Sequence, residues 1–147
     1  MNLATIFLRI ALGVDFLSAV ADRLGLWGAP GQPNVAWGDM PHFLEYTAKL
    51  NPWFPAALIP FVGWVATIAE IVLGLLLLIG FQTRWVARLS GFLLLAFALG
   101  MTFGTGIKTA FDASVFAAAA GAFLLAAAPR YPWSIDQLRT RSQSGVK

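Results

Sequence analysis

Three ionisable residues interrupt the apolar stretches of this 147-residue sequence: Arg9 and Asp15 in the first stretch and Glu70 in the second. An uncompensated charge at the centre of a membrane costs at least about 2.5 kcal/mol, so each residue needs a partner, a wet cavity or neutralisation. Counting from the same membrane face places Arg9 ~10 Å deep and Glu70 ~15 Å deep, a difference that an arginine side chain bridges. We therefore predict that Arg9 and Glu70 form an ion pair.

Small and polar residues accompany this predicted pair. Gly13 lies one turn after Arg9, and Thr67 lies three residues before Glu70 on the same helix face. Two interpretations stay open. The pair fixes the register of two helices, or Arg9 donates hydrogen bonds to a quinone or lipid head group while Glu70 relays a proton. On the second interpretation the ligand site lies between the first two spans and consists of Arg9, Gly13, Thr67 and Glu70.

A second group of polar residues is predicted to line a cavity towards the opposite membrane face. Asp15 and Ser18 recur on one face of the first apolar stretch, and Lys108 lies in a loop that returns to the same side. We expect these three residues to line the cavity, with Asp15 either protonated or paired with Lys108. Asp22 and Asp112 lie at helix ends, where capping and solvent account for them.

The composition indicates a membrane protein. Hydrophobic residues make up 59% of the chain and charged residues 12%, against about 45–50% and about 25% in an average soluble domain. The sequence has no cysteine, which excludes disulfides, thiolate metal sites and iron–sulfur clusters. Its single histidine, His42, excludes a bis-histidine haem held by one chain, and we predict no metal site. Electron transfer would therefore require a partner or a diffusible cofactor.

The apolar stretches predict an all-α fold, an integral membrane four-helix bundle in a single domain over residues 1–147. A helix needs about 20 residues to cross the bilayer. The expected spans cover about 3–21, 56–79, 84–103 and 113–128, and a tail follows over 129–147. We interpret the first span as a retained helix and not as a cleaved signal peptide, because charged residues interrupt it. The last residues of the tail are expected to be disordered.

Local signals predict where these helices begin and end. Gly80 is expected to cap the second span, Thr83 to open the third and Asp112 to open the fourth. Asp39 is expected to cap a short amphipathic helix that ends before Asn51-Pro52. With about 11 residues this helix is too short to cross the membrane. We predict that, between spans one and two, it lies in the membrane interface or folds back over the bundle.

The distribution of basic residues predicts the orientation. One side of the membrane receives six of them: Arg84, Arg88, Arg130, Arg139, Arg141 and Lys147. The opposite side receives three: Arg23, Lys49 and Lys108. Because basic residues concentrate in the cytoplasmic loops and tails of membrane proteins, both termini are expected in the cytoplasm. The net charge of +3 is too scattered to form the basic patch of a nucleic-acid-binding protein.

Several stretches resemble the DoxX family of small bacterial membrane proteins. Residues 63–84, GWVATIAEIVLGLLLLIGFQTR, have an intramembrane glutamate before a Gly-Leu-Leu-Leu run and a Gly-Phe-x-Thr-Arg turn, similar to the second helix of that family. Residues 8–13 (LRIALG), 42–44 (HFL) with 51–52 (NP), and 129–136 (PRYPWSID) agree with it. Where relatives usually continue the first helix with glycine and lysine, this chain has Asp15, Ser18, Asp22 and Arg23.

The resemblance implies a four-helix bundle in a bacterial cytoplasmic membrane and, as in some relatives, a link to oxidoreductase complexes that pass electrons to quinone. We predict an accessory or membrane-anchoring subunit of a redox system, not catalytic alone, that binds quinone or lipid between spans one and two. Alternatives are a self-contained quinone-linked oxidoreductase and a small transporter of protons, cations or solutes. The expected partners are membrane lipid, an oxidoreductase subunit and a second copy of the chain.

The orientation is testable by labelling single cysteines introduced at Gln82 and Gln32. With both termini in the cytoplasm, an impermeant thiol reagent added to intact cells should label Gln32→Cys and leave Gln82→Cys protected. Lysing the cells should expose both positions, which controls for reactivity. The reverse labelling pattern in intact cells would show that the orientation is inverted.

Overall fold

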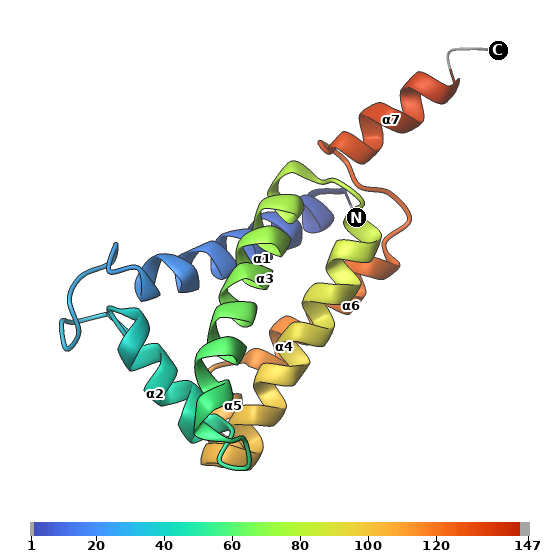
Figure 1. The fold of residues 1–147 in the computed structure, drawn as a ribbon. Coiled ribbons are helices and arrows are strands. Elements are labelled where there is room, and N and C mark those ends of the chain that lie inside the picture. The colour runs from blue at the N-terminus through green and yellow to red at the C-terminus, as the bar shows by residue number, and fades with distance from the viewer. Residues whose placement is uncertain (1, 145–147) are drawn as a thin grey trace.

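Helices make up the regular structure of the described residues, 2–144, in this computed structural model (Figure 1). They are α1 (Asn2–Arg23), α2 (Met40–Leu50), the short 3-10 helix η1 (Ala56–Leu58), α3 (Ile59–Ile79), α4 (Thr83–Thr105), α5 (Ile107–Asp112), α6 (Val115–Ala127) and α7 (Ile135–Ser144). Three segments are long and apolar enough to cross a membrane: α1, Ala56–Ile79 and α4; α6 is a shorter apolar helix. The all-α class is thus confirmed, and the long apolar helices agree with a membrane protein. The extreme end of the tail, expected to be disordered, lies outside the described residues.

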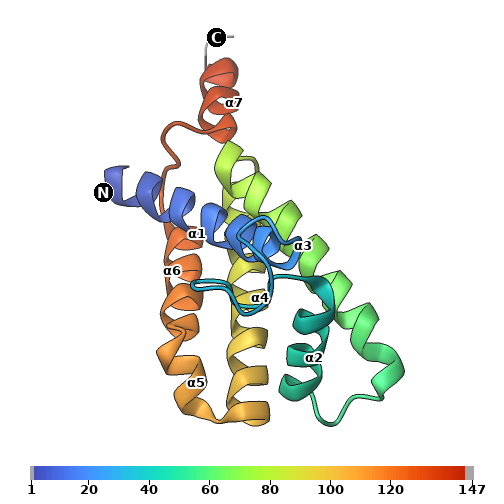
Figure 2. The same ribbon diagram turned by 90° about the vertical axis from the view of Figure 1, so that its left-hand side faces the viewer.

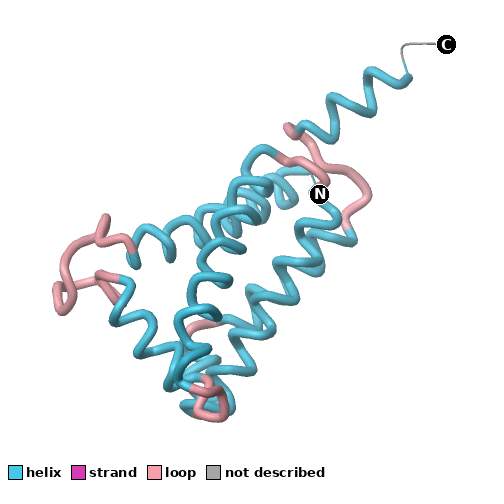
Figure 3. The backbone as a smooth tube through the Cα atoms, viewed as in Figure 1, coloured by secondary structure: helices cyan, strands magenta, loops and turns pink. Residues whose placement is uncertain are grey.

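The four apolar helices form two closely packed pairs, α4 with α6 and α1 with α3. Figure 2 shows α4 and α6 running side by side, while α3 slants away from them towards its N-terminal end and α1 crosses them more steeply. A loop over residues 24–39 and helix α2 lead from the end of α1 back to α3, so these three helices outline a triangle (Figures 1 and 3). We call the end with the α3–α4 turn the Phe81 end, and the end where α4 meets α5 the Gly106 end.

The core forms where these two pairs meet. Its buried side chains come from all four apolar helices: Leu12, Phe16, Leu73, Leu77, Val86, Ala87, Ala122, Leu125 and Ala126. Glycines bring α1 and α3 into backbone contact, because a Cβ built on Gly13 would lie 3.0 Å from the carbonyl oxygen of Gly74. Small residues permit such close approach between membrane helices, where dispersion contacts replace the hydrophobic effect as the source of association.

Large apolar side chains cover the outside of the molecule. Phe7, Phe61, Phe92 and Phe103 are each more than half exposed, and so is Leu124 on α6. Exposed apolar surface on this scale is unfavourable in water but is the ordinary state of a helix that faces lipid. The distribution of side chains therefore agrees with membrane-spanning helices.

Gly80 ends α3 in the left-handed conformation, with φ of 68°, as the sequence predicts. The prediction that Thr83 caps α4 is wrong. Gln82 holds the capping position without a side-chain bond. The carboxylate of Asp136 accepts hydrogen bonds from the backbone N–H groups of Gln82, at 2.8 Å, and Thr83, at 2.7 Å. A carboxylate more than 50 residues away in the sequence thus accepts the hydrogen bonds expected to go to a local capping residue.

The beginning of the fourth apolar helix also differs from the prediction. Asp112 is the last residue of α5, where it pairs with Lys108, and so does not cap the helix that follows. Ser114 lies in the left-handed region, with φ of 54°, and interrupts the chain between α5 and α6. The predicted span 113–128 therefore corresponds to a 13-residue helix preceded by a short separate one.

The short amphipathic helix is confirmed as α2, Met40–Leu50. The Asp39 carboxylate accepts a hydrogen bond from the backbone N–H of His42 at 2.9 Å, and this bond holds the pKa of Asp39 below its usual range. One face of the helix is buried, including Phe43 and Thr47. It contacts α3 and α4.

The tight contact between α1 and α3 generates a stability prediction. Gly74→Ala should destabilise the protein by about 1–2 kcal/mol, because the added methyl lies only 3.1 Å from the Gly13 carbonyl oxygen and from Leu17. Gly100→Ala on α4 is the matched control, since its nearest neighbour would be 3.7 Å away. It should be neutral or stabilise by up to about 1 kcal/mol through helix propensity. Thermal unfolding in detergent compares them, and equal effects would contradict the packing.

Candidate functional site

A buried ion pair joins the last residue of α1 to the middle of α3. Arg23 and Glu70 are each 3% exposed. The guanidinium contacts both carboxylate oxygens: Nη1 donates to Oε2, and Nη2 donates to Oε1 at 3.0 Å. Nη1 also donates to the Thr67 hydroxyl at 2.9 Å. The two charges neutralise each other in a fork geometry, which is the arrangement that makes a buried pair tolerable.

Aromatic rings cover this ion pair. The Arg23 guanidinium carbon lies 3.7 Å from the ring centre of Phe43 on α2 and 5.2 Å from that of Trp37 in the 24–39 loop. The two rings meet edge to face with their centres 5.2 Å apart. Cation–π attraction strengthens as water is removed, so this cover stabilises the charge that it buries. The loop and α2 are therefore held against α1 by the same residue that binds α3.

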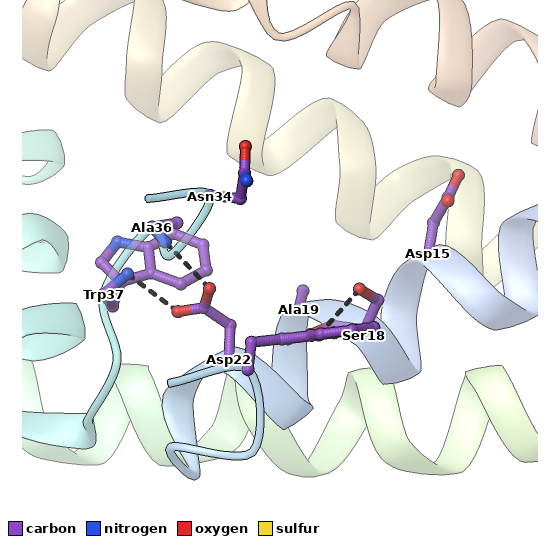
Figure 4. A pocket seen from close by; sticks show the side chains of 8 residues that line it. Asp15, Ser18, Ala19, Asp22, Asn34, Ala36 and Trp37 are labelled. Carbon is purple, nitrogen blue, oxygen red and sulfur yellow. Dashed lines mark hydrogen bonds between the residues drawn. The ribbon is translucent and has the colours of Figure 1, made fainter. Parts of the chain in front are cut away.

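Asp22 fixes the loop from the neighbouring position on α1. Its carboxylate accepts three backbone hydrogen bonds: from Ala36 and Trp37 at 2.8 Å (Figure 4), and from Gly38 at 2.9 Å. A glycine is required at position 38 of the loop, because the φ of Gly38 is +76° and a Cβ added there would lie 2.4 Å from the nitrogen of Pro30. Asp22 is therefore a structural anchor as well as a helix-end residue.

An open pocket of about 470 Å³ lies between α1 and this loop. Its lining combines carboxylates, small side chains and indoles: Asp15, Ser18, Ala19, Asp22, Trp27, Asn34, Ala36 and Trp37. Figure 4 shows Asp15, Ser18 and Asp22 along one side of α1, with Asn34, Ala36 and Trp37 on the facing loop. The indole N–H of Trp27 lies 3.2 Å from the Ser18 hydroxyl oxygen and 3.1 Å from its carbonyl oxygen.

The prediction that Arg9 pairs with Glu70 is wrong. Glu70 binds Arg23, whereas Arg9 donates from Nη2 to the carbonyl oxygen of Trp133 at 2.6 Å. Gly13 on α1 faces Gly74 on α3, so in this antiparallel register Arg9 reaches the level of the α3 terminus. Arg23 lies beyond the level of Glu70 but reaches back to it, because helix side chains lean towards the N-terminus.

Only part of the predicted ligand site comes together. Thr67 and Glu70 share the Arg23 guanidinium, while Arg9 lies at the Phe81 end. The contact of Gly13 with Gly74 fills the space where a slot was expected. A role of these residues in ligand binding stays a prediction.

The predicted outer cavity has a counterpart in the pocket, which Asp15 and Ser18 both line. Lys108 does not line it and is paired with Asp112 on α5. The pairing of Asp15 with Lys108 is therefore wrong, because Lys108 finds an acid one helical turn away on its own helix. Nδ1 of His42 lies 2.7 Å from Oδ1 of Asp39. No group of three or more potential metal ligands is found among the described residues.

The DoxX family model matches residues 4–104, more than half of the sequence. The chain belongs to the DoxX family. The matched region extends from α1 to the end of α4 and includes the ion pair, the aromatic cover and the pocket. No curated protein and no solved structure matches the chain.

Arg23, Trp37 and Phe43 are parts of the site that are absent from the predicted site residues. In the sequence Arg23 counts towards the membrane orientation and as a departure from the family pattern, although it directly follows an apolar stretch and its long side chain can reach back along the helix. The place of Arg23 at the end of that stretch is the signal in the sequence that could have identified it as a partner for Glu70. Nothing local indicated that Trp37 and Phe43 would cover it, since their contacts depend on how the loop folds.

A double-mutant cycle tests the ion pair. Arg23→Met or Glu70→Gln alone should each cost about 3–5 kcal/mol, because each leaves a buried charge without its partner. The double variant should cost clearly less than the sum, as expected for residues in contact. Arg9→Met combined with Glu70→Gln is the matched control and should be additive within about 0.5 kcal/mol. Coupling in the control but not in the Arg23 cycle, measured by thermal unfolding in detergent, would restore the Arg9 pairing.

Proposed function

We propose that this DoxX-family chain is an accessory subunit of a membrane redox system and that it binds quinone in the pocket between α1 and the 24–39 loop. In this proposal the apolar helices form a four-helix membrane bundle, and α2 lies in the membrane interface. The basic residues favour an orientation with both termini in the cytoplasm. The pocket then faces the outer half of a bacterial cytoplasmic membrane.

The lining of the pocket supports a quinone as the ligand. A quinone head group is flat and apolar, with two carbonyl oxygens that accept hydrogen bonds and take up protons on reduction. The pocket offers indole surface from Trp27 and Trp37 and donors from Ser18 and Asn34. The Asp15 carboxylate can accept or release a proton at the pocket wall. Aromatic walls with a few placed polar groups are characteristic of small-molecule sites.

The placement of Trp37 is the observation that carries the proposal. Its side chain lines the pocket and also lies over the Arg23 guanidinium, while its backbone N–H is held by Asp22. One wall of the pocket is therefore fixed by the buried ion pair beneath it. Because this wall is ordered before binding, the protein loses less conformational entropy when a ligand binds.

The accessory role follows from the residue types available. The sequence contains no cysteine and one histidine, so the chain cannot itself hold a thiolate-bound cluster or a bis-histidine haem. A quinone bound to this chain would exchange electrons with a redox group on a partner. The chain would then contribute binding, orientation and a proton-accepting carboxylate.

The test is recovery and binding of quinone. Protein purified from its native membrane should carry quinone detectable by mass spectrometry. A soluble quinone analogue should bind and quench tryptophan fluorescence. Ala19→Trp fills the pocket and should weaken binding at least about tenfold, whereas Ala117→Trp, exposed on α6, should not.

Each alternative result has a clear meaning. Recovery of phospholipid without quinone, together with no analogue binding, would replace quinone by a lipid as the occupant. Equal loss of binding in Ala19→Trp and Ala117→Trp would show that the pocket is not the site.

A further inference from the structure

At the Phe81 end, far from the pocket, Arg9 is a buried cation with incomplete hydrogen bonding. Its side chain is 3% exposed, and Nη2 donates to the Trp133 carbonyl oxygen. Nε and Nη1 have no hydrogen-bond partner among the described residues. The guanidinium lies directly against the α3–α4 turn, because a Cβ on Gly80 would be 2.3 Å from Nη1. The nearby Asp136 carboxylate supplies electrostatic attraction.

The segment that receives this arginine is firmly attached to the turn. The Asp136 backbone N–H donates to the Gly80 carbonyl oxygen at 3.1 Å, and its carboxylate caps α4. The Ser134 hydroxyl donates to the Tyr131 carbonyl oxygen, and the Tyr131 hydroxyl donates to that of Ala126 at 3.2 Å. The chain therefore leaves α6 in a fixed path across the Phe81 end before α7 begins.

A second pocket, of about 400 Å³, lies where this segment meets the end of α3. We call it the exit groove; it is lined by Ile79, Trp133, Ser134, Ile135, Gln137 and Leu138. Trp133 is 78% exposed and Leu138 65% exposed. Ile79 continues the outward apolar surface of α3, so the groove opens directly from the side of the molecule that faces lipid.

The segments that adjoin the exit groove carry basic side chains. Arg84, Arg88, Arg130 and Arg139 are exposed on the segments next to it. Arg139 lies over the ring of Phe81, with its guanidinium carbon 5.3 Å from the ring centre. Within residues 79–88 and 129–139 the sequence contains a single acidic residue, Asp136, whose carboxylate is engaged by the α4 backbone. The Phe81 end is therefore strongly positive.

We propose that the exit groove binds an anionic phospholipid from the adjoining leaflet. An acyl chain would lie against Ile79 and Leu138, and the head-group phosphate would bind Arg84 and Arg139. Arg9 acts behind the groove, where its bond to Trp133 holds one wall in place and its charge adds to the positive field. An apolar groove that opens to lipid beside a group of arginines fits an amphiphilic anion better than a soluble one. The proposal concerns the opposite side of the molecule from the quinone pocket and does not depend on it.

The experiment compares lipids added to delipidated protein in detergent. Phosphatidylglycerol should raise the melting temperature by at least about 4 °C, and phosphatidylcholine with the same acyl chains should have little effect. Inorganic phosphate alone should also have little effect. The doubly substituted Arg84→Gln/Arg139→Gln protein should lose the response to phosphatidylglycerol, and native mass spectrometry should show loss of the bound lipid.

Two controls separate a specific groove from general charge. Lys49→Gln/Lys108→Gln makes the same change of charge near the Gly106 end and should keep the full response. Leu138→Asp introduces a charge into the groove and should abolish the response. An equal response to phosphatidylcholine, a full response to phosphate alone, or a full response in the Arg84/Arg139 variant would overturn the proposal.

Discussion

A glutamate in the middle of an apolar helix is the constraint on which the rest of this structure depends. Glu70 cannot remain charged among lipid-facing helices without a cation, and Arg23 supplies it through two hydrogen bonds. Because Arg23 is the last residue of α1, the chain must immediately turn and cover it. The loop, Asp22 and the aromatic residues of α2 complete that cover. One ion pair thus determines how the first half of the chain is arranged.

The features predicted correctly are those that depend on nearby residues. Apolar length located the long helices, Gly80 marked the end of α3, and Asp39 marked the beginning of α2. Each is decided within a few positions of the sequence. The pairing of Arg9 with Glu70 failed because it depends on the register of two helices. That register is set by the contact of Gly13 with Gly74, which residue spacing alone does not reveal.

Contacts between residues far apart in the sequence account for the remaining differences between the predictions and the structure. Thr83 has the residue type of a cap, yet the carboxylate of Asp136 reaches the α4 terminus from another part of the chain. Asp15 and Ser18 were correctly grouped by their helix face, but the loop opposite them comes from residues 24–39 instead of from the segment around Lys108. The polar side chains were identifiable in the sequence, whereas the partner of each one depended on the fold.

The bond between Arg9 and Trp133 has a consequence for biosynthesis. These residues are 124 positions apart, so at ribosomal rates of about 5–20 residues per second Arg9 emerges roughly 6–25 s before its acceptor exists. During that interval the first helix carries an uncompensated guanidinium. Its insertion therefore requires temporary shelter, from the translocation machinery or from lipid phosphates at the surface. Full integration of this helix becomes coupled to completion of the chain, and truncation before Trp133 should leave the helix poorly held in the bilayer.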